Sequence, residues 1–366
     1  MTEEQGEAMV GSADNATGQL GVGVVGCGYW GPNLIRNLVE NRRCRNLTVC
    51  DLKPERLVKI RQRYPHVGVQ SSFCELLNSP DIDAVVIATP LSTHFPLAEA
   101  ALLAGKHTFV EKPFTATSAQ ARRLLDLARE RNRIVMVGHT FIYAPAVKLI
   151  AELIQKGELG SIHYISSTRV NLGIHQKDTS VIWDLAPHDL SMLLHWLGEP
   201  PIQVSAVGRD YVQPGIPDVA FIDLVFESGA IAHVQVSWLA PSKLRNTTIV
   251  GSRRMVVYDD TENLEKVKVF DKGVSYRDPQ TFGEFQLSYR SGDIVSPSLD
   301  SYEPLAAELD DFLIAGLTGR RPQSNAESGL QVVRVLEAAE RSLMNGGHLE
   351  RLEWEPIEVG VAKGDR

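Results

Sequence analysis

The sequence of 366 residues is poor in the features that mark several classes of protein. It has four cysteines, Cys27, Cys44, Cys50 and Cys74, which form no CxxC pair and show no metal-type spacing with histidine. This pattern is not that of a disulfide framework or a metal site, and it indicates reduced thiols in a cytoplasm. No apolar run reaches the roughly 18 residues that a membrane helix needs.

The sequence also has fewer basic than acidic residues. It contains 37 lysines and arginines and 45 aspartates and glutamates, which gives a net charge of −8. We therefore expect no broad basic surface for nucleic acid or an anionic membrane. The N-terminus lacks the basic start and apolar core of a signal peptide. Residues 1–18 and 356–366 are expected to be tails, the first of them disordered, and the length between them predicts two domains.

A glycine turn follows the first apolar run. Leu20–Val25 predicts a strand, Gly26-Cys-Gly-Tyr-Trp-Gly31 follows with the spacing G-x-G-x-x-G, and residues 32–40 predict a helix. The first glycine permits a tight turn, the second lets the backbone approach a pyrophosphate, and the third lets the helix pack against the strand. The helix N-terminus presents N–H groups to phosphates. Tyr29 and Trp30 are expected to cover the pyrophosphate or the nicotinamide.

An acidic residue follows the second predicted strand, residues 46–50. Asp51 lies 20 positions beyond Gly31, where a carboxylate accepts hydrogen bonds from the ribose hydroxyls and repels a 2′-phosphate. This position favours NAD(H) over NADP(H). Two alternatives stay open: Asp51 caps the next helix, or Lys53 assists a 2′-phosphate.

Strands continue to alternate with helices, at 84–88, 107–110 and 134–137 with helices at 97–103 and 118–131. This alternation predicts an α/β fold with a Rossmann-type, doubly wound parallel sheet. Ligands of such sheets bind beyond the carboxyl ends of the strands. The predicted cofactor-binding residues lie in the glycine turn or at these ends: Gly26, Gly28, Tyr29, Trp30, Gly31, Asp51, Thr89, Pro90, His94, Glu111, Lys112 and His139.

Charged residues also crowd the start of an apolar helix in mid-chain, V181-I-W-D-L-A-P-H-D-L. Asp184 and His188 are four apart and would share one helix face. Pro187 is compatible with a first helical turn, where its missing N–H has no partner. Taken singly, Asp184 is also a typical N-cap, and His188 a typical capping or core histidine.

The motifs GCGYWG, ATPLSTH, EKP and WDLAPHDL occur in this order, and the set resembles the Gfo/Idh/MocA family of NAD(P)-dependent sugar and cyclitol oxidoreductases. The resemblance spans residues 20 to 350. It implies a catalytic set of Lys112, Asp184 and His188. His188 would be the general acid/base, since the imidazole pKa lies near neutrality. Asp184 would bind substrate or orient the histidine, and Lys112 would bond to the reacting oxygen and the nicotinamide ribose; no metal is expected.

The resemblance also implies a second domain with an open, mainly antiparallel sheet, where the substrate meets the nicotinamide. A predicted hairpin of strands 219–226 and 230–238 fits this. We expect a Rossmann domain over 19–141 and an α+β substrate-binding and oligomerisation domain over 142–355, with C-terminal helices able to pack back on the first. Apolar residues of both parities within 221–225 predict a homodimer or homotetramer through the open sheet.

The predicted substrate is a sugar, and the turn GCGYWGPN looks like that of relatives in nucleotide-sugar pathways, with the redox centre at C3. Arginine would suit a pyrophosphate. An inositol or free-sugar dehydrogenase, an NAD-dependent glycosidase with transient C3 oxidation, and a non-catalytic dinucleotide-binding sensor stay open; an FAD site would leave the EKP and D-x-x-x-H motifs unexplained. The predicted substrate-binding residues are Lys112, Arg169, Asn171, Trp183, Asp184 and His188.

Overall fold

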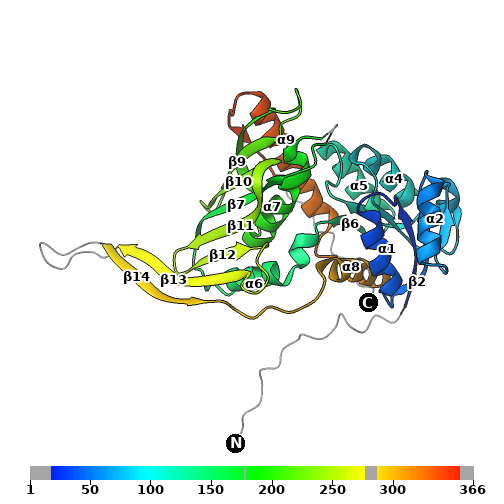
Figure 1. Ribbon diagram of the computed structural model, residues 1–366, viewed down its shortest axis with the longest axis horizontal. Helices are drawn as coiled ribbons and strands as arrows, with labels where there is room; N and C mark the ends of the chain where they lie inside the picture. The colour runs from blue at the N-terminus through cyan, green and yellow to red at the C-terminus, as the bar shows by residue number, and fades with distance from the viewer. Residues whose placement is uncertain (1–17, 177–178, 277–286, 355–366) are drawn as a thin grey trace, which may run out of the picture. The chain divides into compact units, whose positions relative to one another are not determined.

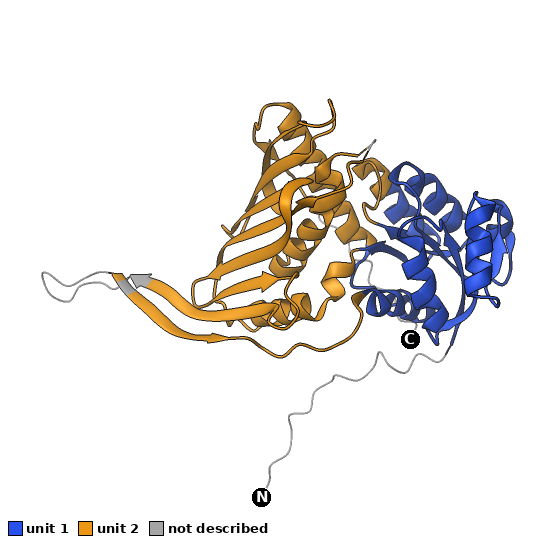
Figure 2. Ribbon diagram, viewed as in Figure 1, with its two compact units in different colours: residues 1–111, 123–138, 305–325 blue, residues 112–122, 139–304, 326–366 orange. Residues whose placement is uncertain are grey.

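The computed structural model describes residues 18–176, 179–276 and 287–354, which form two compact units (Figures 1 and 2). The first unit contains the described residues up to 111, with 123–138 and 305–325; the second contains 112–122, 139–304 and the described residues from 326. Apart from Gly18, the tails predicted at 1–18 and 356–366 lie outside the described residues. Lys112, which the sequence assigns to the first domain, thus belongs to the second unit.

The first unit is built on a six-stranded sheet in the order β3-β2-β1-β4-β5-β6, and all its strand pairs are parallel. This is the doubly wound order, whose reversal lies between β1 and β4. Strands β1, β4 and β6 are buried along their whole length, as a sheet covered on both faces requires. The elements that contribute to this unit are β1 (Leu20–Val25), α1 (Gly31–Glu40), β2 (Cys44–Cys50), α2 (Pro54–Arg63), β3 (Gly68–Gln70), α3 (Phe73–Asn78), β4 (Ala84–Ile87), α4 (Leu91–Leu103), β5 (His107–Glu111), α5 (Ser118–Glu130), β6 (Val135–Gly138) and α8 (Pro304–Thr318).

The second unit is built on a nine-stranded sheet in the order β14-β13-β12-β11-β7-β10-β9-β8-β15. Only the β7–β10 pair is parallel among the strand pairs of the described residues, so the sheet is mainly antiparallel, as predicted. Its elements are η1 (Thr140–Tyr143), α6 (Pro145–Gln155), β7 (Ile162–Leu172), α7 (Val181–Leu197), β8 (Pro201–Arg209), β9 (Val219–Phe226), β10 (Ile231–Ser237), β11 (Leu239–Gly251), β12 (Met255–Asp259), β13 (Val267–Tyr276), β14 (Leu287–Val295), α9 (Ala326–Met344) and β15 (Glu350–Arg351).

One face of the nine-stranded sheet is covered by helices, with α7 packed on β7 and β10 and α9 packed on β8 (Figure 1). The alternation along β10 fits this arrangement. Ala232, Val234 and Val236 are buried, whereas His233 and Gln235 on the other face are half-buried. The sheet therefore has one apolar face under the helices and one open face.

Helix α7 starts earlier than the sequence predicts. It begins at Val181 with Ser180 as its N-cap, so Pro187 lies inside the helix and the interpretation of Pro187 as a first-turn proline is wrong. Apolar Val181, Ile182 and Trp183, all buried, extend the helix in front of the charged residues. Within the described residues no helix is long and apolar enough to cross a membrane.

Candidate active site

The glycine turn of the first unit has the close approaches that its spacing predicts. Gly26 has φ +100°, and a Cβ there would lie 2.4 Å from the carbonyl oxygen of Ala88. A Cβ at Gly31 would lie 2.1 Å from the carbonyl oxygen of Gly26, so only glycine lets α1 start this close to β1. Gly28 has open space, with the nearest atom to its Cβ position 4.0 Å away. This geometry fits the pyrophosphate of a dinucleotide.

Two aromatic residues stand on the outside of this turn. Tyr29 is 93% exposed, and Trp30, the N-cap of α1, is 39% exposed. Large side chains with this much exposure on a ligand-binding turn are available to cover a bound dinucleotide. Their predicted contacts with the cofactor stay a prediction.

Asp51 is buried at the end of β2, where three donors hold its carboxylate. The backbone N–H groups of Cys27 and Lys53 donate to it at 2.7 and 2.8 Å, and Arg56 donates at 3.1 Å. Burial alone would raise the pKa of Asp51, but these hydrogen bonds and the Arg56 charge lower it below its usual range. Asp51 is therefore an anion at neutral pH. It follows β2 and does not cap α2, whose N-cap is Lys53.

The remaining predicted cofactor residues of the first unit lie at the ends of β4 and β5. His94, in the first turn of α4, contacts the carbonyl oxygen of Thr89 at 2.9 Å through Nε2 and is 1% exposed. Thr89 also bonds to Thr93, and Pro90 is the N-cap of α4. His94 thus ties the β4–α4 turn together. Glu111 ends β5 and is buried.

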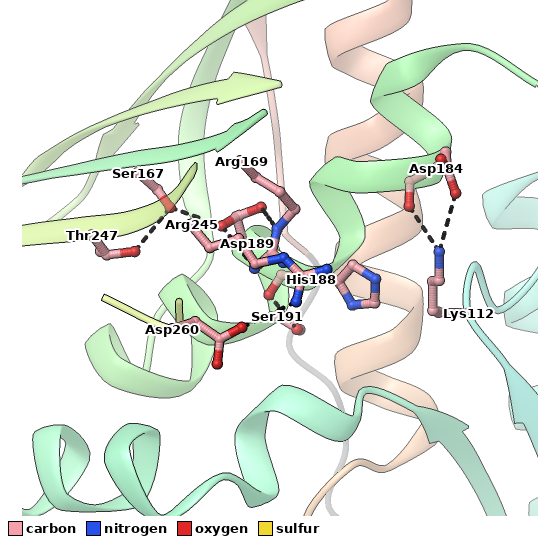
Figure 3. Close-up of polar contacts among 10 residues, drawn as sticks. All are labelled: Lys112, Ser167, Arg169, Asp184, His188, Asp189, Ser191, Arg245, Thr247 and Asp260. Carbon is pink, nitrogen blue, oxygen red and sulfur yellow. Dashed lines mark hydrogen bonds and ion pairs between the residues drawn. The ribbon is translucent and has the colours of Figure 1, made fainter. Parts of the chain in front are cut away.

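Lys112 and Asp184 form a polar contact within the second unit (Figure 3). The Lys112 ammonium donates to the backbone carbonyl of Asp184 at 2.8 Å and to its carboxylate oxygen Oδ1 at 3.4 Å. The two side chains are 20% and 26% exposed, so both stay within reach of a ligand. Lys112 follows Glu111 directly in the chain, which fixes it by covalent connection to the carboxyl end of β5.

Asp184 and His188 both lie on α7, four residues apart, as predicted. The Asp184 carboxylate, however, bonds to Lys112 and to the indole of Trp238, at 3.0 Å, rather than to His188. His188 packs edge-on against the Phe141 ring with centroids 4.9 Å apart. Its Nδ1 atom is enclosed and has no hydrogen-bond partner among the described residues.

The imidazole of His188 is held in its neutral form. Burial lowers the pKa of His188 well below its usual value, and nearby groups that carry or can take positive charge lower it further: Lys112, Arg169, Arg245 and His139. In Figure 3 the ring lies between the arginine cluster and the Lys112–Asp184 pair. Neutral imidazole can accept a proton, which is the form a base requires.

His139, the first residue after β6, is a second enclosed imidazole. It is 1% exposed, and neither ring nitrogen has a partner among the described residues. Burial, followed by the Lys112 charge, lowers the pKa of His139 to about 3. Buried polar atoms without partners are rare and point to a ligand or water that satisfies them.

Arg169 is buried and paired with an acidic residue of α7. Its guanidinium forms a buried ion pair with Asp189, at 2.6 Å from Nε and 3.3 Å from Nη2, and Ser167 donates to the same carboxylate at 2.8 Å. Arg169 thus joins β7 to α7, and its predicted contact with substrate stays a prediction. Beside it, Arg245 bonds to Asp260 at 3.1 Å.

Two other predicted substrate-binding residues, Trp183 and Asn171, lie apart from the Lys112–Asp184 contact. The indole N–H of Trp183 donates to the Glu340 carboxylate at 2.6 Å, and the ring is 7% exposed, so Trp183 is a core residue between α7 and α9. Asn171 lies half-buried near the end of β7. Neither residue contacts the Lys112–Asp184 pair in the hydrogen bonds of the described residues.

Sequence reasoning missed several members of this site: Phe141, Trp238, Arg245 and Asp260. Trp238 reaches Asp184 across 54 residues of sequence. The alternation of its strand predicts only that Trp238 points inward with the other apolar residues. Nothing in the local sequence distinguishes it from a core residue, because strand pairing determines which side chain it contacts.

The comparisons with known proteins agree with this architecture. Residues 20–139 match the model of an oxidoreductase family with an NAD-binding Rossmann fold, and residues 147–257 match the GFO/IDH/MocA C-terminal domain. A UDP-N-acetylglucosamine 3-dehydrogenase of Acidithiobacillus ferrooxidans is 30% identical over 70% of this chain and 80% of its own length. A myo-inositol 2-dehydrogenase of Thermotoga maritima is 26% identical over 88% of this chain and 96% of its own. A solved structure of the former enzyme superposes with a TM-score of 0.74 at 26% identity, covering 89% of this chain and 98% of that one.

Proposed function

Because the chain belongs to the Gfo/Idh/MocA family of NAD-binding oxidoreductases, which act on CH–OH groups, we propose that it interconverts a secondary alcohol and a ketone at C3 of a nucleotide sugar. The observation that carries the proposal is the contact of Lys112 with Asp184 beside a neutral His188 on the same helix. A bound nicotinamide coenzyme supplies the hydride acceptor or donor. The protein has to supply the proton transfer and the position of the reacting carbon.

Each of the three residues has a distinct role in the proposal. His188 takes the hydroxyl proton during oxidation and returns it during reduction, since its neutral imidazole is the basic form. Lys112 donates a hydrogen bond to the reacting oxygen and polarises the carbonyl in the reduction direction. Asp184 holds the ammonium of Lys112 in place and accepts a hydrogen bond from a substrate hydroxyl.

The preferred coenzyme in the proposal is NAD(H). Asp51 is ionised, and a carboxylate at this position bonds to ribose hydroxyls and repels a 2′-phosphate. Arg56 could attract a 2′-phosphate, but its guanidinium already donates to Asp51, which neutralises part of its charge.

The proposed location is the cytoplasm. The four cysteines are free thiols, as is usual for proteins of that reducing compartment.

A nucleotide sugar is favoured over the other substrates by the identity and coverage of the UDP-N-acetylglucosamine 3-dehydrogenase. An inositol dehydrogenase is the second candidate, because a myo-inositol 2-dehydrogenase covers even more of the chain at lower identity. A dinucleotide sensor would have no use for Lys112 and His188. An NAD-dependent glycosidase would hydrolyse its substrate with no net change in NADH.

The test is a panel of UDP- and dTDP-sugars, free sugars and inositols, incubated with the protein and NAD⁺ or NADH while the absorbance of NADH is followed. The proposal expects the largest kcat/KM with a nucleotide sugar and a 3-keto product. Turnover of inositol alone would favour the second candidate. Hydrolysis of a glycoside without net NADH formation would favour the glycosidase.

The proposal includes a second copy of the chain packed on the open face of the nine-stranded sheet. An apolar row crosses this face, because directly paired residues of neighbouring strands point to the same side. Its members Tyr164 and Ile231 are 43% and 53% exposed, although they are large and apolar. From strand to strand the row consists of Val225, Ile231, Tyr164, Val250, Met255, Phe270 and Ile294, of which Val250 is buried.

The polar row beside it favours another copy as the partner. It begins at Asp223 on β9 and ends at Lys268 on β13, and every member is polar except Val257 on β12. A two-fold packing with antiparallel rows would set Asp223 of one copy opposite Lys268 of the other. Light scattering after size exclusion should give a dimer or tetramer, and Ile231→Glu a monomer. Leu264→Glu, at a 90% exposed position outside both rows, is the control; a monomeric unaltered protein at micromolar concentration would contradict the proposal.

A further inference from the structure

We propose that Trp238, directly after β10, is a positioning residue that fixes the Asp184 carboxylate against Lys112; this inference rests on the proposed function. The indole Nε1–H donates to Oδ2 of Asp184 at 3.0 Å, whereas Lys112 approaches Oδ1 at 3.4 Å. The two oxygens thus have different donors. The carboxylate cannot rotate without losing one of these hydrogen bonds.

The indole itself is held by its surroundings. Trp238 is 1% exposed, its backbone N–H donates to the carbonyl of Asp218 at 2.9 Å, and its carbonyl accepts from the N–H of Gly173 at 3.0 Å. A Cβ at Gly173 would lie 2.8 Å from Cδ1 of the indole ring, so a residue without a side chain leaves room for the ring. The ring of His175 packs against the indole with centroids 5.3 Å apart. These contacts leave the N–H one direction, toward Asp184.

Tryptophan suits this role chemically. Its indole nitrogen can only donate a hydrogen bond, and an ionised carboxylate can only accept one. The direction of the bond from Trp238 to Asp184 is therefore fixed. It also carries no charge to compete with the ammonium of Lys112. The resulting chain of contacts, Trp238 to Asp184 to Lys112, transmits the rigidity of the sheet to the lysine proposed to bind the reacting oxygen. Small misplacements of such a group cost about 10²-fold in rate.

The first test compares Trp238→Phe with Trp196→Phe, a control that loses an indole N–H from the same unit. Trp196 is buried on α7 and donates to the carbonyl of Val147 at 3.0 Å, away from the Lys112–Asp184 pair. Trp238→Phe is expected to lower kcat by about 10- to 100-fold with KM changed less than about threefold. Trp196→Phe is expected to leave both near the unaltered values. Equal effects of the two substitutions on an active protein would overturn the inference.

The second test is a double-mutant cycle with Asp184→Ala. If Trp238 acts through Asp184, adding Trp238→Phe to Asp184→Ala changes kcat by less than about threefold, whereas independent roles would multiply the two losses. A merely structural tryptophan would also show the multiplied loss. That result would contradict the proposal.

The third test needs no activity. In protein with ¹⁵N-labelled tryptophan, the indole N–H resonance of Trp238 should shift when Asp184 is replaced by alanine, and that of Trp196 should stay in place. An unmoved Trp238 resonance would show that the contact does not exist. Absence of turnover by the unaltered protein on the whole panel would instead sink the proposed function, and with it the catalytic part of this inference, whatever the spectrum shows.

Discussion

The charge of His188 is set by the groups that surround it more than by the residue itself. An exposed histidine would be half-protonated near pH 6.5, but burial and the positive neighbours keep this imidazole neutral. Below pH 6.5 an unperturbed base would begin to lose its proton-accepting form, whereas the lowered pKa preserves that form.

We therefore predict that kcat/KM for alcohol oxidation shows no inflection near pH 6.5 and that its acid limb lies below the usual range of a histidine. The measurement is a pH–rate profile from pH 5 to 9. Arg245→Gln removes one of the positive neighbours, so the acid limb should move to higher pH in this variant. An acid limb centred at 6.5 in the unaltered protein would contradict the neutral, enclosed imidazole.

Asp51 determines the coenzyme at the same scale. We predict that the unaltered protein binds NADH more tightly than NADPH, and that Asp51→Ala weakens NADH binding by about 10- to 100-fold, while NADPH binding is unchanged or stronger because the 2′-phosphate is no longer repelled. Fluorescence titration with both coenzymes measures the ratio. Lys53→Ala is the matched control, because only its backbone N–H contacts Asp51. Tighter NADPH binding before any substitution would reverse the preference.

At the scale of elements, β7 and α7 are joined by a buried ion pair. Arg169 and Asp189 have side chains that are 5% and 2% exposed, and their contact crosses from the sheet to the helix that carries His188. Removing one partner leaves the other charge buried and uncompensated, which typically costs about 3–5 kcal/mol. This pair explains why two acids lie close together on α7, since Asp184 bonds to Lys112 and Asp189 bonds to Arg169 of the sheet.

We predict that Asp189→Ala lowers the free energy of unfolding by about 3–5 kcal/mol in urea denaturation. Glu158→Ala, which breaks the exposed pair with Arg254, should cost no more than about 1 kcal/mol. Equal effects of the two substitutions would contradict a buried, uncompensated charge at Arg169.

Periodicity predicted those elements whose apolar residues recur regularly. The limits of β9 are the predicted 219–226, and β10 differs from its predicted range of 230–238 by one residue at each end. Helix α4 starts at Leu91, although the pattern placed its start at 97, because polar residues and Pro96 interrupt its first turns. Regular apolar spacing is thus a sufficient signal, and its loss near functional residues hides the ends of elements.

The candidate site was predictable where its residues share a local motif. The spacing of Asp184 and His188 places them on one face of a helix. The glycine turn is predicted by its G-x-G-x-x-G spacing between a strand and a helix. Trp238 and Arg245 were not predictable, because only the register of β10 and β11 brings them to α7. The ion pair of Arg169 with Asp189 was not predictable, since an arginine at a strand end can bind a ligand or a buried aspartate.

At the scale of the whole molecule, buried neutral histidines link stability to pH. The pKa of His139 falls to about 3 in the folded protein from a usual value of 6.5. Between these two values the unfolded chain binds a proton that the folded chain does not. The free energy of unfolding must therefore decrease as the pH falls from 6.5, by up to about 1.4 kcal/mol per pH unit for this group.

We predict that the free energy of unfolding in urea falls from pH 7 to pH 6 to pH 5. His139→Asn should reduce its slope against pH by about the contribution of one proton. The substitution of exposed His163 should leave the slope unchanged. A stability that is independent of pH over this range would mean that His139 is charged or open to water in the folded protein.

The account depends above all on Lys112 and His188 acting together at one reacting carbon. Its most direct test is the rate of NADH formation with the best substrate of the panel, measured for the unaltered protein, Lys112→Ala and His188→Ala at saturating NAD⁺. We predict that each substitution lowers kcat/KM by about 10²–10⁴-fold, while the affinity of His188→Ala for NADH stays within about threefold of the unaltered protein. Activity that survives both substitutions undiminished would contradict the account.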